Sequence, residues 1–267
     1  MTDRVLLYVY AVAAGGAELD DVASQVTGID GAAVCRVAGP GGLTALVSPV
    51  DALRFAEDTL PAQLEDLDRL ESIARAHHTV VDAAFSRATV LPLRLATVYR
   101  GEAGVVGMLS DRQVSFERLL HRLHAHAEMG VKVYALAPAE SGPKSLAAGE
   151  GTDSPGRAYL QRRRAQRRAA DDVYRAASEA ADAAVRLAER HSSARAVHRP
   201  QQNEWSAGRG ENVANDAYLV PVASLDVFRA DIAALSDPAS GVVVEVTGPW
   251  APYSFAGPAA VGAEEPA

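Results

Sequence analysis

Residues 242–255 read VVVEVTGPWAPYSF, and this stretch closes the fold of the second half of the chain. The valine-rich run at its start favours a β-strand, because β-branched side chains fit a pleated surface. Gly248 and Pro249 predict that the strand stops there, since glycine tolerates unusual φ angles and proline lacks a backbone N–H. The prolines that follow alternate with three aromatic residues, Trp250, Tyr253 and Phe255. An extended segment with this much apolar surface must pack against its own domain or against a partner.

The strand at 242–246 is the last element of a pattern that begins near Gly130. Hydrophobic periodicity and breakers predict, in order, strand 131–136, helix 157–191, strands 194–197 and 212–222, helix 225–235 and strand 242–246. Residues 138–155 are rich in Gly, Ser, Pro and Ala and indicate a loop between the first strand and the long helix. The order β-α-β-β-α-β is that of a ferredoxin-like domain.

The first half opens in a similar way. The sequence predicts a strand at 5–10, a hairpin of 33–37 and 43–47 around Gly39–Gly42, a short helix capped by Asp51, a helix from Pro61 to Phe85, an extended segment at 90–98 and a helix at 102–128. We therefore expect an α+β protein with two domains of related architecture. Their predicted bounds are 1–128 for an N-terminal α/β domain, 129–256 for a ferredoxin-like domain and 257–267 for a disordered tail.

Composition excludes several classes of protein. The 267 residues carry a formal net charge of −8, which disfavours general nucleic-acid binding, and 48% are hydrophobic, which supports a core. The single cysteine, Cys35, excludes an internal disulfide, fits the cytoplasm and is predicted to be a small buried strand residue. No run approaches the length of a membrane span, and the N-terminus does not resemble a signal peptide.

Histidines provide the candidate sites for chemistry. His121, His124 and Glu128 would share one face of the predicted helix, at a spacing that could bind zinc. Positive charge from Arg118 and Arg122 opposes a cation there. The neighbouring pair His77 and His78 could supply an acid or a base, although a satisfied, half-buried histidine is the simpler interpretation. No motif for a phosphate, a dinucleotide or an activated nucleophile is present. We predict no catalytic, cofactor-binding or metal-binding residues.

A block of arginines, at positions 162, 163, 164, 167 and 168, begins the long helix. It suits an acidic protein surface or RNA. It is equally explained as a solvated helix face whose arginines pair with Asp171, Asp172 and Glu179. The opposite stripe is narrow and rich in alanine, which suits close packing on another helix.

Four segments together resemble the gas vesicle L/F family of accessory proteins. They are the TGPWAPYSF ending at 247–255, AHHTVV with TVLPLRLATVY at 76–81 and 89–99, EMGVKVY at 128–134 and NDAYLV at 215–220. Their order and spacing match the family over roughly residues 4–256. Ala96 stands where the family usually has glycine and Ala251 where it usually has proline, so a role that needs φ > 0 at position 96 comes into question.

The resemblance implies a function that needs no active site. Members of this family are thought to assist assembly of the gas vesicle and to contact its small hydrophobic shell protein and other accessory proteins. It implies a protein of the cytoplasm and the gas vesicle, without nucleic acid or a membrane span. The alternative is a metal-binding regulator or an enzyme that uses His77, His121, His124 and Glu128. We further expect the shell protein to bind the N-terminal half and the aromatic ending to join the two domains.

Overall fold

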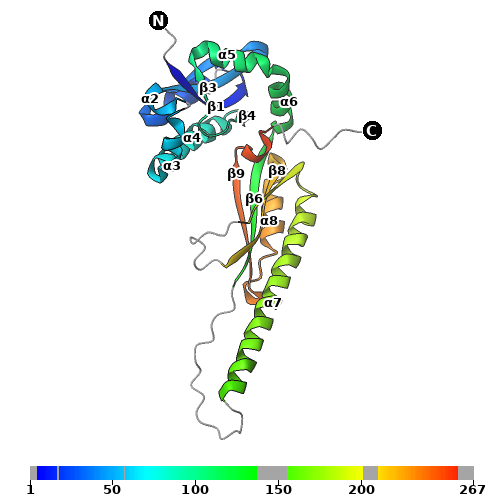
Figure 1. The fold of residues 1–267 in the computed structure, drawn as a ribbon. Helices are drawn as coiled ribbons and strands as arrows, with labels where there is room; N and C mark the ends of the chain where they lie inside the picture. Colours follow the sequence, from blue (N-terminus) through cyan, green and yellow to red (C-terminus); the bar gives the residue numbers. More distant parts are fainter. Residues whose placement is uncertain (1–4, 17, 57, 137–154, 201–209, 258–267) are drawn as a thin grey trace, which may run out of the picture. The chain divides into compact units, whose positions relative to one another are not determined.

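The computed structural model describes residues 5–16, 18–56, 58–136, 155–200 and 210–257, and divides the chain into two compact units (Figure 1). Unit 1 comprises Met1–Glu128 together with Trp250–Ala267, and unit 2 comprises Met129–Pro249. Residues 250–256, which the sequence assigns to the second domain, are thus grouped with the first unit. The predicted loop at 138–155, apart from Pro155, and the predicted tail, apart from Gly257, lie outside the described residues.

Unit 1 is built on an antiparallel sheet in the order β2-β3-β1-β4, with β5 also paired to β1. Its strands are β1 (Leu6–Ala14), β2 (Cys35–Ala38), β3 (Leu43–Val50), β4 (Val90–Pro92) and β5 (Val98–Arg100). The hairpin predicted around Gly39–Gly42 is confirmed, because β2 and β3 pair across the short turn η2 (Pro40–Gly42). The central strand β1 is buried along most of its length, which requires cover on both faces of the sheet.

Helices provide that cover. They are α1 (Glu18–Gln25), α2 (Ala52–Phe55), α3 (Leu60–Glu65), α4 (Leu67–Phe85), α5 (Gly101–Asp111) and α6 (Gln113–Leu123), with the short turns η1 (Ile29–Gly31) and η6 (Tyr253–Phe255). Helix α4 lies against the face that carries Tyr8 and Tyr10, and its buried residues join them in one core. Helix α5 lies on the other side of the sheet (Figure 1).

Two helix predictions for unit 1 are wrong in extent. The helix predicted from Pro61 to Phe85 is broken at Asp66, whose side chain accepts a hydrogen bond from the Arg69 N–H at 3.0 Å and so caps α4. The helix predicted to continue to Glu128 is interrupted at Arg112 and ends at Leu123. Beyond it Ala125 has φ 56, and the chain enters a strand in which buried and half-buried residues alternate.

Unit 2 contains the predicted succession of strands and helices. It comprises β6 (His126–Ala135), α7 (Pro155–Ala188), β7 (Ala194–His198), β8 (Glu211–Pro221), α8 (Leu225–Ala233) and β9 (Val242–Trp250), with the short turns η4 (Val222–Ser224) and η5 (Pro238–Ser240). Strand β6 begins in the last residues assigned to unit 1. The predicted stop at Gly248 is wrong, because β9 continues through Gly248 and Pro249 to Trp250.

The core of unit 2 lies between its sheet and its two helices. Alternate residues of β6 pack with Ala177, Ala184 and Ala188 of α7 and with Phe228 and Ile232 of α8. The sheet has the order β7-β8-β6-β9. In each unit the first strand therefore lies between the third and the fourth, and the second strand is at an edge. The chain is a mixed α+β protein with two antiparallel sheets. None of the described helices combines the length and the apolar composition that a membrane span requires.

Candidate functional site on unit 1

A buried polar network joins β1 to helix α4. The Tyr8 hydroxyl accepts a hydrogen bond from the Ala96 N–H at 3.0 Å and lies 3.0 Å from Nδ1 of His77. The His77 side chain is only 3% exposed, and its Nε2 has no hydrogen-bond partner among the described residues. Sequence analysis proposed His77 as a half-buried histidine; the structure buries it almost completely and leaves one nitrogen unsatisfied.

Burial decides the protonation state of this histidine. Loss of hydration, with a smaller contribution from the neighbouring His78, lowers the pKa of His77 to about 4. The Leu93 carbonyl opposes this decrease but is not placed to form a hydrogen bond with Nε2. His77 is therefore neutral near pH 7, and desolvation also raises the pKa of the facing Tyr8 hydroxyl. Neither group changes its protonation state near pH 7, because His77 stays neutral and Tyr8 stays protonated, so their contact is a hydrogen bond between two neutral groups.

A second tyrosine makes a similar contact, which sequence analysis did not foresee. The Tyr10 hydroxyl accepts a hydrogen bond from the Ile29 N–H at 2.8 Å and lies 2.6 Å from the Ser48 hydroxyl. The sequence signal that could have predicted this contact is the presence of two tyrosines in an otherwise apolar strand, since a buried tyrosine hydroxyl needs a hydrogen-bond partner. This network ties the turn η1 to the sheet.

The aromatic ending of the chain packs on helix α4. The His78 ring lies 5.7 Å from the Trp250 ring and 6.4 Å from the Tyr253 ring, and the Tyr253 ring lies 6.1 Å from that of His77. Phe255 is 2% exposed within unit 1, but Trp250 and Tyr253 remain 41% and 36% exposed. The ending thus completes unit 1 and leaves an aromatic surface of His78, Trp250 and Tyr253.

Glu128 holds this ending in place. Its carboxylate accepts hydrogen bonds from the backbone N–H and from the hydroxyl of Ser254, each at 2.8 Å. Each oxygen of the Glu128 carboxylate thus accepts one hydrogen bond from Ser254. Three of the four segments that carry the family resemblance contribute to these contacts in unit 1. The fourth, residues 215–220, lies in β8, where Asp216 is buried and pairs with Arg195 at 3.0 Å.

The proposed histidine–carboxylate face does not form, because Glu128 lies in a strand rather than on the helix of His121. His121 is in the last turn of α6, while His124 follows the helix and lies 3.2 Å from the Thr89 hydroxyl. Across the described residues, no group of three or more His, Cys, Asp and Glu side chains is placed to hold a metal ion.

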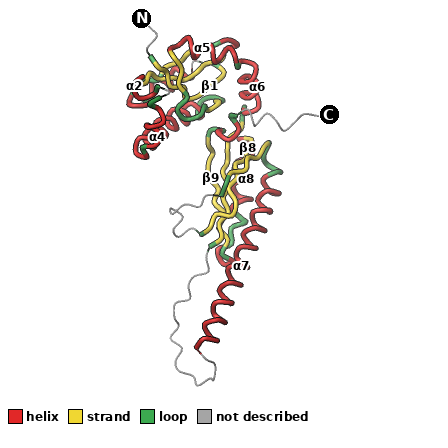
Figure 2. Tube along the Cα trace, viewed as in Figure 1, coloured by secondary structure: helices red, strands yellow, loops and turns green. Residues whose placement is uncertain are grey.

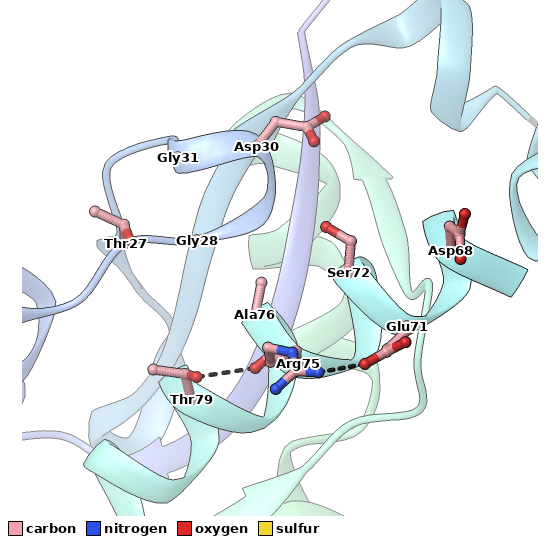
Figure 3. Close-up of a pocket in the computed structure, with 10 residues that line it drawn as sticks. All are labelled: Thr27, Gly28, Asp30, Gly31, Asp68, Glu71, Ser72, Arg75, Ala76 and Thr79. Carbon is pink, nitrogen blue, oxygen red and sulfur yellow. Dashed lines mark hydrogen bonds and ion pairs between the residues drawn. The ribbon is translucent and has the colours of Figure 1, made fainter.

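A hollow of about 540 Å³ lies between the loop of η1 and helix α4 (Figure 3). Figure 3 shows Ser72 and Ala76 of α4 facing the loop that carries Asp30. The Asp30 carboxylate pairs with Arg69, whose hydrogen bonds lower the pKa of this carboxyl. Glu71 pairs with Arg75. Two of the three carboxylates that line the hollow, those of Asp30 and Glu71, thus have cationic partners. The full lining is Thr27, Gly28, Asp30, Gly31, Asp68, Glu71, Ser72, Arg75, Ala76 and Thr79.

Two other predictions need correction. Cys35 lies in β2 as expected but is exposed rather than buried, and the buried residues of this segment are Val34 and Val37. Partial desolvation raises the pKa of its thiol, which works against a nucleophilic role. In the part of the chain that the structure describes, Arg163, Arg164, Arg167 and Arg168 form no ion pair with Asp171 or Asp172, and Asp172 pairs with Arg175 instead.

Comparisons of the chain with known proteins indicate one family. The family model described as gas vesicle synthesis protein GvpL/GvpF matches residues 6–257. The chain is 41% identical to gas vesicle protein L from Streptomyces sp. (strain CB03234) over 256 residues, which cover 96% of this chain and 94% of that protein.

Two solved structures have a similar fold. The crystal structure of gas vesicle protein GvpF from Anabaena sp. PCC7120 matches with a TM-score of 0.64 at 18% identity, over 95% of this chain and 96% of that one. GvpF from Microcystis aeruginosa matches with a TM-score of 0.60 at 18% identity, over 95% and 99% of the two chains. The match to the family model and the 41% identical relative together show that the chain belongs to the gas vesicle GvpL/GvpF family.

Proposed function

We propose that this protein acts in gas vesicle formation by binding the hydrophobic shell protein through unit 1, in the cytoplasm and without catalysis. Family membership supports the role in gas vesicle formation. The single observation that carries the binding site is that β2, the terminal strand of the unit 1 sheet, pairs only with β3 among the strands that the structure describes. An edge strand with one neighbour can accept a further strand from a partner.

The hydrogen-bond pattern of the hairpin indicates which groups of β2 are available. The Gly39 N–H donates to the Leu43 carbonyl at 2.8 Å. Because hydrogen-bonded and non-hydrogen-bonded pairs alternate along an antiparallel ladder, the N–H of Val37 points toward β3 and those of Arg36 and Ala38 point outward. The Arg36 side chain is held by Asp20 of α1, so Ala38 offers the simpler position for a test.

The variant Ala38→Pro removes one outward donor. Proline is tolerated on an edge strand where its missing N–H faces away from the ladder, so the fold should persist. We expect the variant to melt close to the parent and to retain clearly less shell protein in a pull-down. Val37→Pro is the matched control, because it removes a donor to β3 and should lower the melting temperature.

A second variant separates the two candidate surfaces of unit 1. Tyr253→Ala reduces the exposed aromatic surface and leaves β2 untouched. If this variant loses the shell protein while Ala38→Pro binds like the parent, the aromatic surface is the binding site instead of the strand edge. If neither variant changes binding and residues 129–249 alone retain the shell protein, the assignment to unit 1 is wrong.

We also propose that unit 2 has the ferredoxin-like topology. What supports this is its element order, β6-α7-β7-β8-α8-β9, together with the placement of β6 between β8 and β9. Backbone NMR contacts between β6 and β8 and between β6 and β9 are expected; contacts between β6 and β7 would contradict it. Contacts with other gas vesicle accessory proteins are part of the same proposal and can be read from the same pull-downs.

A further inference from the structure

Helix α7 extends well past the sheet of unit 2 (Figures 1 and 2). Its buried residues are confined to its later turns, at Ala177, Ala184 and Ala188. From residue 156 to residue 168 every side chain that the structure describes is exposed. At 1.5 Å per residue this segment, the arginine arm, is about 20 Å of helix, and its described side chains take no part in the hydrophobic core of unit 2.

All charged residues of the arginine arm are positively charged. It carries six arginines and no acidic residue, at positions 157, 162, 163, 164, 167 and 168. Four of them, Arg163, Arg164, Arg167 and Arg168, form no ion pair or hydrogen bond within the part of the chain that the structure describes. The whole chain has a net charge of −8, so the residues outside the arm carry −14. The arm is therefore a concentrated positive surface on an acidic molecule.

We propose that the arginine arm docks on the acidic surface of a second copy of this chain. Because one polypeptide carries both a positive and a negative surface, the arginine arm of one copy is complementary to the acidic surface of another. Such a contact joins two different patches and is therefore head-to-tail. The acidic remainder of the molecule repels both candidates, but nucleic acid carries a much denser negative charge than a second copy does, so the net charge of −8 disfavours nucleic acid more. The contact uses unit 2 of one copy and the surface around α3 and α4 of unit 1 of the other, and it does not involve β2, the strand proposed to bind the shell protein.

The counterpart is the acidic face around α3 and the start of α4. Glu65, Asp66, Asp68 and Glu71 are all exposed within seven consecutive residues. Asp68 and Glu71 also line the hollow beside η1, which gives long side chains a place to enter. Glu71 pairs with Arg75 on the surface, and such exposed pairs are weak enough to exchange partners. Arginine suits this face because its guanidinium can bind a carboxylate through two parallel hydrogen bonds.

Sedimentation velocity of the purified full-length protein tests the proposal. We expect concentration-dependent self-association at low ionic strength (about 0.02 M) that weakens at least about tenfold at about 0.5 M, where the Debye length is only a few ångströms. The variant Arg167→Gln/Arg168→Gln should lose most of this association. Arg186→Gln/Arg190→Gln removes the same charge from two exposed arginines at the far end of α7 and should leave it unchanged.

Charge reversal tests the pairing itself. Arg167→Glu/Arg168→Glu and Glu65→Arg/Asp68→Arg should each fail to self-associate, and their mixture should associate with each other. Circular dichroism of each variant checks that the helices are kept. A protein that stays monomeric at low ionic strength, or reversed variants that do not recover in the mixture, overturns the proposal. So does an arm variant that self-associates like the parent but loses binding to a single-stranded RNA probe, because the partner would then be nucleic acid.

Discussion

His77 is a histidine kept neutral by its surroundings, and this gives unit 1 a defined response to acid. Its folded pKa of about 4 lies below the value of 6.5 expected for an unfolded chain. Between these two values the unfolded state binds more protons, so the free energy of unfolding rises with pH. The contribution is complete above pH 6.5 and is lost as the pH falls toward 4. A difference of this size corresponds to about 3 kcal/mol.

Urea unfolding at a series of pH values measures this effect. We expect His77→Gln to unfold with a shallower dependence on pH between 6.5 and 4 than the parent. His121→Gln, which changes an exposed histidine of α6, should keep the parent's slope. If His77→Gln and the parent have equal slopes, His77 is not a buried neutral group.

Ala96 occupies a position where the family usually has glycine, and its φ of 62 shows that the left-handed conformation is kept. Alanine in that conformation costs roughly 1–2 kcal/mol, while glycine would lose somewhat more entropy on folding. We expect Ala96→Gly to increase the free energy of unfolding by about 0.5–1 kcal/mol. In the interior of α4, Ala83→Gly should instead lower it by about 1 kcal/mol or more. A decrease for Ala96→Gly in thermal or urea unfolding would contradict the expectation.

At the scale of single residues, the sequence indicates which residue types could form a site better than it indicates which residues contact one another. Residue type and context predicted a satisfied, half-buried histidine at position 77, whereas the structure buries it almost completely and leaves Nε2 without a hydrogen-bond partner among the described residues. The contact of His77 with Tyr8 could not be predicted, because the two residues are 69 positions apart and only the fold brings them together. For the same reason Glu128 was assigned to a helix face, whereas it binds Ser254 across 126 positions.

Among the elements, the aromatic ending divides into an anchor and an exposed part. Phe255 is buried, whereas Trp250 keeps 41% of its surface exposed. We expect Phe255→Ala to lower the free energy of unfolding by about 3–5 kcal/mol. Trp250→Ala should cost less, about 1–2 kcal/mol, because less apolar area returns to water. Thermal unfolding of the two variants should therefore rank Phe255→Ala lower, and the reverse order would assign the anchor to Trp250.

Most strands and helices were predictable because their signals are local. Alternation and β-branched runs located β1, the hairpin and the strands of unit 2, and the 3.6-residue period located α4 and α7. The errors occur at ends. Asp66 caps a new helix inside an apparently continuous periodic pattern, and Ala125 turns the chain with a conformation that alanine rarely adopts. Each break depends on a single residue, and the free energies of the broken and the continued helix differ by only about 1 kcal/mol. A periodic pattern over many residues therefore does not reveal the break.

At the scale of the whole molecule, unit 1 is made from two separated parts of the chain. Ala251 and Phe255 are buried, and Ala251 belongs to the same core as Tyr8 and Tyr10. We expect residues 1–128 alone to be poorly folded, and the same residues joined by a short Gly-Ser linker to 250–257 to fold cooperatively. Residues 129–249, which have their own core, should fold without them.

Two-dimensional NMR spectra and thermal melts of the three fragments check this. If residues 1–128 alone melt as sharply and at the same temperature as the linked fragment, the ending is dispensable. Any pull-down meant to assign binding to unit 1 should use the linked fragment, because the shorter one would lose binding by unfolding.

The divided construction of unit 1 also sets the order of events during translation. Unit 2 lies between the two parts, so about 120 residues must be synthesised after Glu128 before Trp250 is added. At a rate of roughly 5–20 residues per second, that interval lasts roughly 6–24 seconds. Throughout it, the nascent chain displays the side of α4 that carries His78 without the aromatic ending that will lie on it. A ribosome stalled just before residue 250 would therefore hold a chain whose first unit is still incomplete.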